Sequence, residues 1–328
     1  MEAIRTIFQF LMSAIPLGMT FLYGSTGEII TEKSGHLNLG IPGIMCMGAA
    51  GGCTALELLM ISSGNAKLPA VLVVVIGILA AFLTAAVMGA LYCFLTVTLR
   101  ANQNVTGLTM TIFGVGTMEY IFAGLTESKY LFALGFFRYP FAQAKPGTIM
   151  HDMRYCGIMV FLAIIIAVVT SIVLNKTKVG LHLRAVGENP ATADAVGINV
   201  TRYKYIATCI GSGIAGLGGF YYVMDYAGSP ESYLSIEPLG WLSIALVIFA
   251  LWRPTLSIVG SIVFGCLYIA GSYLPSIRAL QLEMSTTPLL KMLPYAVTII
   301  VLIISSIRNK RENQPPAGLG NNYFREER

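Results

Sequence analysis

The sequence predicts an all-α polytopic membrane protein with about 8–10 transmembrane helices, some of them discontinuous. Of its 328 residues, 55% are hydrophobic and only 11% are charged, whereas a soluble domain carries about 25% charged residues. Apolar runs of membrane-spanning length recur along the whole chain. We therefore expect one transmembrane domain over residues 1–310 and a short cytoplasmic C-terminal tail over residues 311–328.

Hydropathy divides the chain into candidate spans of about 20 mostly apolar residues each. The candidate spans are 7–26, 38–60, 69–99, 104–124, 155–174, 205–225, 238–252, 256–274 and 289–307. The first is read as a retained span, because no basic region precedes it and no small-residue cleavage site follows it. The run 69–99 is too long for one upright helix, and the run 238–252 is short, so both are expected to be irregular.

Lysine and arginine predict the orientation, because they concentrate on the cytoplasmic side of membrane proteins. The loop 175–204, the turn at Arg253 and the chain after Ile307 are rich in these residues and would share the cytoplasmic side. The chain would then be a multi-pass protein of the cytoplasmic membrane of a bacterium. The N-terminus is external if nine spans cross the membrane and cytoplasmic if ten do.

Several motifs argue against other functions. The three histidines lie far apart and no Cys-x-x-Cys pair exists, so neither a metal site nor an enzyme centre is expected. The stretch 211–216 has the spacing Gly-x-Gly-x-x-Gly, but it lies inside an apolar span, which favours helix packing over nucleotide binding. No phosphate-binding loop is present, so no cofactor is expected on this chain. A nucleic-acid partner is not expected either, whereas membrane lipid is.

Carboxylates are sparse within the spans. Glu57, Glu119 and Asp225 each fall near the predicted outer end of a span. Carboxylates at the middle of the bilayer would indicate a proton or ion relay. Their positions are more typical of interfacial residues and argue against a proton-coupled transporter.

The long polar interruption 180–204 predicts a short helix over residues 190–196. Asn189 is a favourable N-cap and Pro190 suits the first helical position. Gly197 suits the left-handed residue that ends a helix. An isolated helix this short is unstable in water, so it must pack on its own membrane domain or on a partner. The local sequence is equally compatible with a helix that docks a partner protein and with a capped connector that has no partner.

At this loop the sequence resembles a known family. The string GLHLRAVGENPATADAVGINVTRYKY is similar to the cytoplasmic loop of ABC importer permeases of the ribose and branched-chain amino-acid superfamily. The closest likeness is to the simple-sugar and nucleoside permeases that work with a basic-membrane-protein-type binding lipoprotein. EIITEKSGHLNLGIPGIMCMGA, FLTVTLRANQNVTGL and LGWLSIALVIFALWRP also resemble motifs of this family. Pro42 stands where the family usually has Glu, and Leu251 where it has Gly.

The resemblance implies a permease subunit that carries a nucleoside such as guanosine and is driven by a separate cytoplasmic ABC ATPase, which uses the ATP. It also implies a second, nonidentical permease subunit and an extracellular substrate-binding lipoprotein. The loop 180–204 would dock the ATPase. The residues implied in this coupling are Arg184, Gly187, Glu188, Asn189, Pro190, Ala193, Gly197 and Ile198.

The substrate path is sought where helices are interrupted, because irregular backbone at membrane depth is tolerated when it lines a cavity. The stretches 35–43 and 237–241 are two such interruptions, one in each half of the chain. Amide and indole groups could contact a polar solute. The candidate path residues are Asn38, Asn102, Gln103, Asn104 and Trp241. Helix capping and interhelical hydrogen bonds explain the same amides equally well.

Two alternatives to a nucleoside permease stay open. The same machine could carry a simple sugar such as ribose, a difference that the sequence barely constrains. A secondary transporter would belong to a different class, because it would need neither an ATPase nor a docking helix. A polytopic membrane enzyme would need His, Asp or Glu clustered near one membrane face, and the sequence shows no such cluster.

Overall fold

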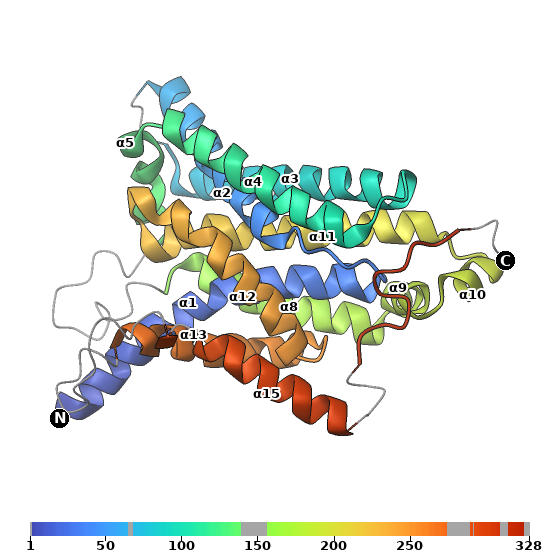
Figure 1. Ribbon diagram of the computed structural model, residues 1–328. Helices are drawn as coiled ribbons and strands as arrows, with labels where there is room; N and C mark the ends of the chain where they lie inside the picture. Colours follow the sequence, from blue (N-terminus) through green and yellow to red (C-terminus); the bar gives the residue numbers. More distant parts are fainter. Residues whose placement is uncertain are drawn as a thin grey trace.

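The computed structural model describes residues 2–64, 68–138, 156–273, 289–290, 292–308 and 314–324. Across these residues the chain is helical and contains no strand, which confirms the all-α prediction. The long helices lie side by side in a bundle (Figure 1). They are α1 (Glu2–Lys33), α2 (Ile41–Ser63), α3 (Ala70–Cys93), α4 (Gln103–Gly124), α8 (Ile158–Lys176), α11 (Val200–Tyr221), α12 (Ile236–Phe249), α13 (Pro254–Tyr273) and α15 (Leu293–Arg308). Each of the nine expected spans overlaps one of them.

Seven helices of the described chain are long and apolar enough to cross a membrane, and α1 and α15, the first and the last helix in chain order, are two further helices. Of the two runs expected to be irregular, 69–99 departs from regular α-helix, whereas 238–252 is regular α-helix up to Phe249 and only the segment before it differs. The run after α3 continues as a π-helical turn over Phe94–Thr98. The 14-residue helix α12 is preceded by a 3-10 helix over Pro230–Ser235. Both departures occur next to a connection between helices, where a change of helix type is common.

Glycines let the central helix α11 pack closely against its neighbours. A Cβ added at Gly216 or at Gly48 would collide with the facing helix, and Gly211 is similarly close to the backbone oxygen of Gly27. Small residues allow such close approach between membrane helices. The stretch 211–216 therefore serves helix packing and lies inside α11, as the sequence predicts.

Helix α1 extends seven residues beyond the predicted end of the first span, to Lys33. This extension buries two carboxylic acids, Glu28 and Glu32, which are 0% and 3% exposed. Glu28 Oε1 accepts a hydrogen bond of 3.0 Å from the backbone N–H of Asn38, and the indole N–H of Trp252 donates to Glu32 Oε2. Sequence inspection had found no such buried acids, because both positions were assigned to a loop.

The segments that were predicted to be cytoplasmic lie at one end of the bundle. The N–H of Gly318 in the C-terminal tail donates to the carbonyl of Gly187 at 2.9 Å, and that of Gly320 donates to the carbonyl of Gly35 at 3.2 Å. Gly35 follows the C-terminal end of α1, whose 32 residues span about 48 Å. The first turn of α1 therefore lies at the end of the bundle opposite the tail, as Figure 1 shows.

Candidate functional site

The polar loop folds as two short helices, α9 (Lys178–Glu188) and α10 (Pro190–Ala195). The side chain of Asn189 accepts a hydrogen bond of 3.0 Å from the backbone N–H of Thr192 and caps α10. Gly197 has φ +87°, the left-handed conformation that ends the helix. These findings confirm the predicted N-cap, first helical residue and terminator. Helix α9, capped by Thr177, was missed because its polar sequence was read as loop.

Helix α10 packs on its own chain through one face only. Ala193 is 2% exposed and contacts a small apolar cluster formed with Val186 and Val200. On the other face the side chains are exposed, and Val196, directly after α10, is 72% exposed. We call α10 together with residues 196–198 the docking segment. Its buried side supplies the support that so short a helix needs.

A close backbone contact connects α9, which precedes the docking segment, to helix α1. Gly187, at the end of α9, packs so tightly against the carbonyl of Lys33 that an added Cβ would collide with it. Gly180, at the start of α9, is similarly close to the carbonyl oxygen of Val173 in α8. Displacement of α9 and α10 therefore pushes directly on two long helices, since packed interiors transmit strain.

The C-terminal tail crosses the same surface. The carboxylate of Glu188 accepts a hydrogen bond of 3.4 Å from the backbone N–H of Ala317, and Tyr323 Oη donates to Asp194 Oδ2 at 2.8 Å. Asn322 Nδ2 donates to the carbonyl of Arg100 at 2.9 Å. Sequence inspection did not find this contact. The change from RNKREN to the uncharged stretch QPPAGLGNNYF is the signal that could have indicated it.

The other predicted coupling residues lie in or beside these contacts. Arg184 is half-buried on α9, and Glu188 and Asn189 are exposed between α9 and α10. Ile198 is half-buried and packs on the cluster under α10. The structure thus brings all eight predicted coupling residues to one surface at the tail end of the bundle.

The five predicted path residues are divided between two places. Asn102 is an exposed N-cap of α4, whose side chain accepts a hydrogen bond of 3.1 Å from Val105 N–H, and Asn104 is exposed beside it. Gln103 is buried, accepts from Leu37 N–H at 2.9 Å and donates to Asn322 Oδ1 at 3.1 Å. All three lie at the tail end of the bundle.

Asn38 lies in the non-helical linker between α1 and α2, as expected, but the predicted interruption at 237–241 is wrong: these residues are continuous α-helix within α12, because Pro238 stands in the first turn, where proline is tolerated. A Cβ added at Gly240 in α12 would lie 2.5 Å from Cα of Pro42 in α2. Asn38 is fully buried, its Oδ1 accepts from Gly40 N–H at 2.9 Å, and its Nδ2 has no partner among the described residues. Trp241, half-buried, follows Gly240 directly. The contact between Gly240 and Pro42 therefore joins two helices, α12 and α2, and Pro42 follows the linker that holds Asn38.

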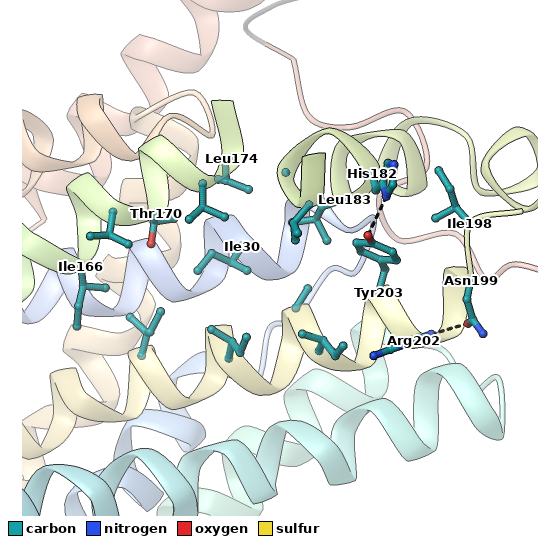
Figure 2. Close-up of a pocket in the computed structure, with 18 of the residues that line it drawn as sticks. Ile30, Ile166, Thr170, Leu174, His182, Leu183, Ile198, Asn199, Arg202 and Tyr203 are labelled. Atoms are coloured by element: carbon teal, nitrogen blue, oxygen red, sulfur yellow. Dashed lines mark hydrogen bonds between the residues drawn. The ribbon is translucent and has the colours of Figure 1, made fainter. Parts of the chain in front are cut away.

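An apolar groove of about 990 Å³ lies beside the docking segment, between α8, α9 and α11 (Figure 2). Its walls at membrane depth are aliphatic, with Ile166 and Leu174 from α8 facing α11. At its polar end, His182 Nδ1 and Tyr203 Oη are hydrogen-bonded at 2.9 Å. The groove thus changes from apolar to polar at the level of α9.

A bundle of long apolar helices, seven of which are long and apolar enough to cross a membrane, defines a multi-pass membrane protein. Comparison with protein families gives a specific assignment. The family described as the permease component of branched-chain amino acid transport systems matches residues 7–302. The chain belongs to this family of transport permeases.

Three curated relatives are similar over most of the chain. The Nucleoside ABC transporter permease protein NupC of Lactococcus lactis subsp. cremoris (strain MG1363) is 28% identical over 93% of this chain and 94% of its own length. The Putative glucose ABC transporter permease protein TsgC13 of Haloferax volcanii is 28% identical over 96% and 97%. The Guanosine ABC transporter permease protein NupQ of Bacillus subtilis (strain 168) is 29% identical over 89% of each chain. No solved structure matches the chain.

Proposed function

We propose that this chain is the membrane-spanning permease subunit of an ABC importer that carries a nucleoside such as guanosine into a bacterial cell. The observation that carries the proposal is the docking segment, which is capped at both ends, supported from one side and exposed on the other. The chain belongs to a family of transport permeases and its sequence contains no phosphate-binding loop, so ATP-driven transport would require a separate ATPase. An ATPase bound to this segment would supply it.

The coupling mechanism follows from the contacts. A cytoplasmic ATPase would bind the exposed side of α10, together with Glu188 and Asn189. When the ATPase moves on ATP binding and hydrolysis, α9 would follow, and Gly187 would transmit the motion to α1 through the contact with Lys33. Helix α1 leads to the linker that holds Asn38. The motion would thus reach the interior point where Pro42 meets Gly240.

We propose that the substrate passes near that interior point. Asn38 and Trp241 would contact the solute there, while Asn102, Gln103 and Asn104 would stand at the cytoplasmic mouth. Support comes from the unpartnered amide nitrogen of Asn38 and from the covered irregular backbone around it. Residues 1–310 would form this transmembrane domain, and residues 311–328 would form a cytoplasmic tail that folds back on it.

The relatives support a nonidentical second permease. The chain resembles NupC along its whole length, but it is also 28% identical over 99 residues to the Nucleoside ABC transporter permease protein NupB of the same organism. It is likewise 25% identical over 281 residues to the Glucose ABC transporter permease protein TsgB13 of Haloferax volcanii, the organism of TsgC13. Two related permeases per organism are what a heteromeric pair requires. A substrate-binding lipoprotein would deliver the solute on the outer side.

The second candidate function is import of a simple sugar, which TsgC13 favours because its likeness to this chain covers 96% of the residues. The decisive measurement is uptake of radiolabelled guanosine, with and without excess unlabelled ribose, in cells that carry or lack the gene. Loss of guanosine uptake on deletion, without competition by ribose, is the expected result. Unchanged guanosine uptake with loss of sugar uptake would move the protein to the sugar branch.

The same uptake assay separates the ABC machine from a secondary transporter. Uptake by an ABC importer needs ATP and a functional ATPase partner, so depletion of ATP at a maintained proton gradient should stop it. Uptake that persists without ATP and stops when an uncoupler dissipates the proton gradient would contradict the proposed class.

A further inference from the structure

A second hollow, of about 680 Å³, lies on the tail side of α11 and is not part of the substrate path described above. The first turns of α11, the end of α3 and the C-terminal tail form its walls. Among its lining residues are three basic ones, Arg100, Arg202 and Lys204. Its volume falls within the range of about 300–1,000 Å³ that is usual for pockets that bind small molecules.

Lys204 is the unusual member of this lining. Its side chain is only 4% exposed, yet its ammonium group makes no hydrogen bond or ion pair with any residue that the structure describes. A buried charge without a partner is strongly unfavourable, and buried lysines are normally paired. The ammonium nitrogen is not among the fully covered polar atoms that lack a partner, so it opens into the hollow that it lines, where an anion or water can solvate it.

The other charged side chains that line the hollow also have a net positive charge. Arg100 and Arg202 are exposed at the rim, and the guanidinium of Arg100 lies over the ring of Phe324 at 4.8 Å. The acidic residue in the lining is Asp194, which already accepts the hydrogen bond from Tyr323 Oη. Three cations and one carboxylate thus produce a field that attracts anions.

The polar and aromatic walls complete a site for a phosphate ester. Tyr205, Tyr323 and Asn322 line the hollow beside the basic groups. Arginine and lysine are the usual ligands of phosphate oxygens, and tyrosine rings offer flat surfaces to an attached organic group. The buried His36 also lines it, but its Nδ1 is hydrogen-bonded to Thr208 Oγ1 at 3.2 Å.

We propose that this hollow is a binding site for a small phosphate-bearing anion, held by Lys204 at its base and by Arg202 and Arg100 at its rim. The phosphate could come from a soluble mononucleotide, which is a monoester, or from a lipid headgroup, which is a diester, and both would present anionic phosphate oxygens to Lys204. Because Gly197 and Asn199 belong to the same lining, a bound anion fastens the docking segment to α11 and the tail. That consequence for transport rests on the proposed function, whereas the binding itself does not.

The test measures binding with the full-length protein in phosphatidylcholine nanodiscs. Thermal unfolding is followed while inorganic phosphate or guanosine monophosphate is added, with chloride matching the ionic strength. We expect a saturable rise in unfolding temperature, and in the variant Lys204→Gln an affinity weaker by about tenfold or more. Lys178→Gln is the matched control, because Lys178 is exposed on α9 outside the hollow.

A second variant and a second lipid composition distinguish the possible explanations of the result. Arg202→Gln alters an exposed residue, so it tests the site even if Lys204→Gln fails to fold. Nanodiscs that contain phosphatidylglycerol distinguish the source: competition with the soluble anion indicates a lipid headgroup, and absence of competition indicates a soluble phosphate. No saturable shift, or an equal shift in the wild type and in both hollow variants, would overturn the proposal. A second result would also overturn it: the variant Lys204→Gln binds the anion as the wild type does but associates more weakly with the ATPase. That result would mean that the ammonium group pairs with a carboxylate of the partner protein.

Discussion

Tyr323 Oη donates a hydrogen bond of 2.8 Å to Asp194 Oδ2, a residue 129 positions earlier in the chain. Asp194 belongs to α10, so this bond ties the C-terminal tail to the docking segment. The tail also binds the α1–α2 linker through Gly35 and the α3–α4 connection through Arg100. The C-terminal tail thus contacts three parts of the chain: α10 in the docking segment, the α1–α2 linker and the α3–α4 connection.

Loss of the tail contacts should weaken coupling. Tyr323→Phe removes one hydrogen bond worth about 0.5–1.5 kcal/mol, and a stop codon at Gln314 removes all of these contacts. We expect uptake per ATP hydrolysed to fall slightly in the first variant and severely in the second, with membrane insertion retained. Asn321→Ala is the control, since Asn321 is exposed and its side chain makes no hydrogen bond with the described residues. Full coupling in the truncated protein would contradict this role.

Gly197→Val should uncouple ATP hydrolysis from transport without preventing insertion. At φ +87° a side chain is strained, although nothing lies within 4 Å of the added Cβ. The cost of about 1–2 kcal/mol would therefore change the end of α10 without a collision. Gly64→Val is a matched control, because Gly64 also has positive φ and open space but ends α2. The measurement is the ratio of ATPase rate to uptake in proteoliposomes, and wild-type transport in Gly197→Val would refute the assignment.

The contact between Gly48 and Gly216 predicts a helix-packing defect. Gly48→Leu inserts a side chain where α2 meets α11, and overpacking costs about 1–3 kcal/mol or more. We expect a lower unfolding temperature in detergent and a smaller yield of folded protein. Gly116→Leu in α4 provides the comparison, because nothing lies within 4 Å of its added Cβ. Equal unfolding temperatures for the two variants would show that the close approach is not needed.

Trp252→Phe removes the indole donor of the buried Glu32. A buried acceptor without its partner costs about 1–3 kcal/mol, so the free energy of unfolding should fall by that amount. Denaturant titration in detergent measures it. Trp241→Phe is the control for loss of an indole, because the indole N–H of Trp241 makes no hydrogen bond with a residue that the structure describes. If the free energy of unfolding falls by a similar amount in both variants, the hydrogen bond to Glu32 makes no specific contribution to stability.

The predicted orientation can be checked with single cysteines. Val196→Cys lies in the docking segment, and Glu127→Cys lies in α5 (Glu127–Tyr130), at the other end of the bundle in Figure 1. An impermeant maleimide added to intact cells should label Glu127→Cys only, and the same reagent added to inverted vesicles should label Val196→Cys only. The reverse pattern would place the docking segment outside the cell and exclude a cytoplasmic ATPase as its partner.

Local sequence signals were sufficient for the long helices and for the bounds of α10, but not for α9. The apolar runs predicted each long helix, because about 20 apolar residues have few other stable arrangements in a membrane. Asn189, Pro190 and Gly197 predicted the bounds of α10, because caps form between residues that are close in sequence. The spacing of Gly211 and Gly216 within an apolar run predicted close helix packing in the same way.

Hydropathy and bonds between near neighbours are enough to predict the class of this protein, its long helices and the position of α10. The meeting of Glu32 with Trp252, the meeting of Tyr323 with Asp194 and the position of Lys204 in a hollow depend on the packing of the whole chain. These contacts join residues far apart in the chain. They form only when the helices pack, and the sequence near each residue does not indicate which distant residue it will meet.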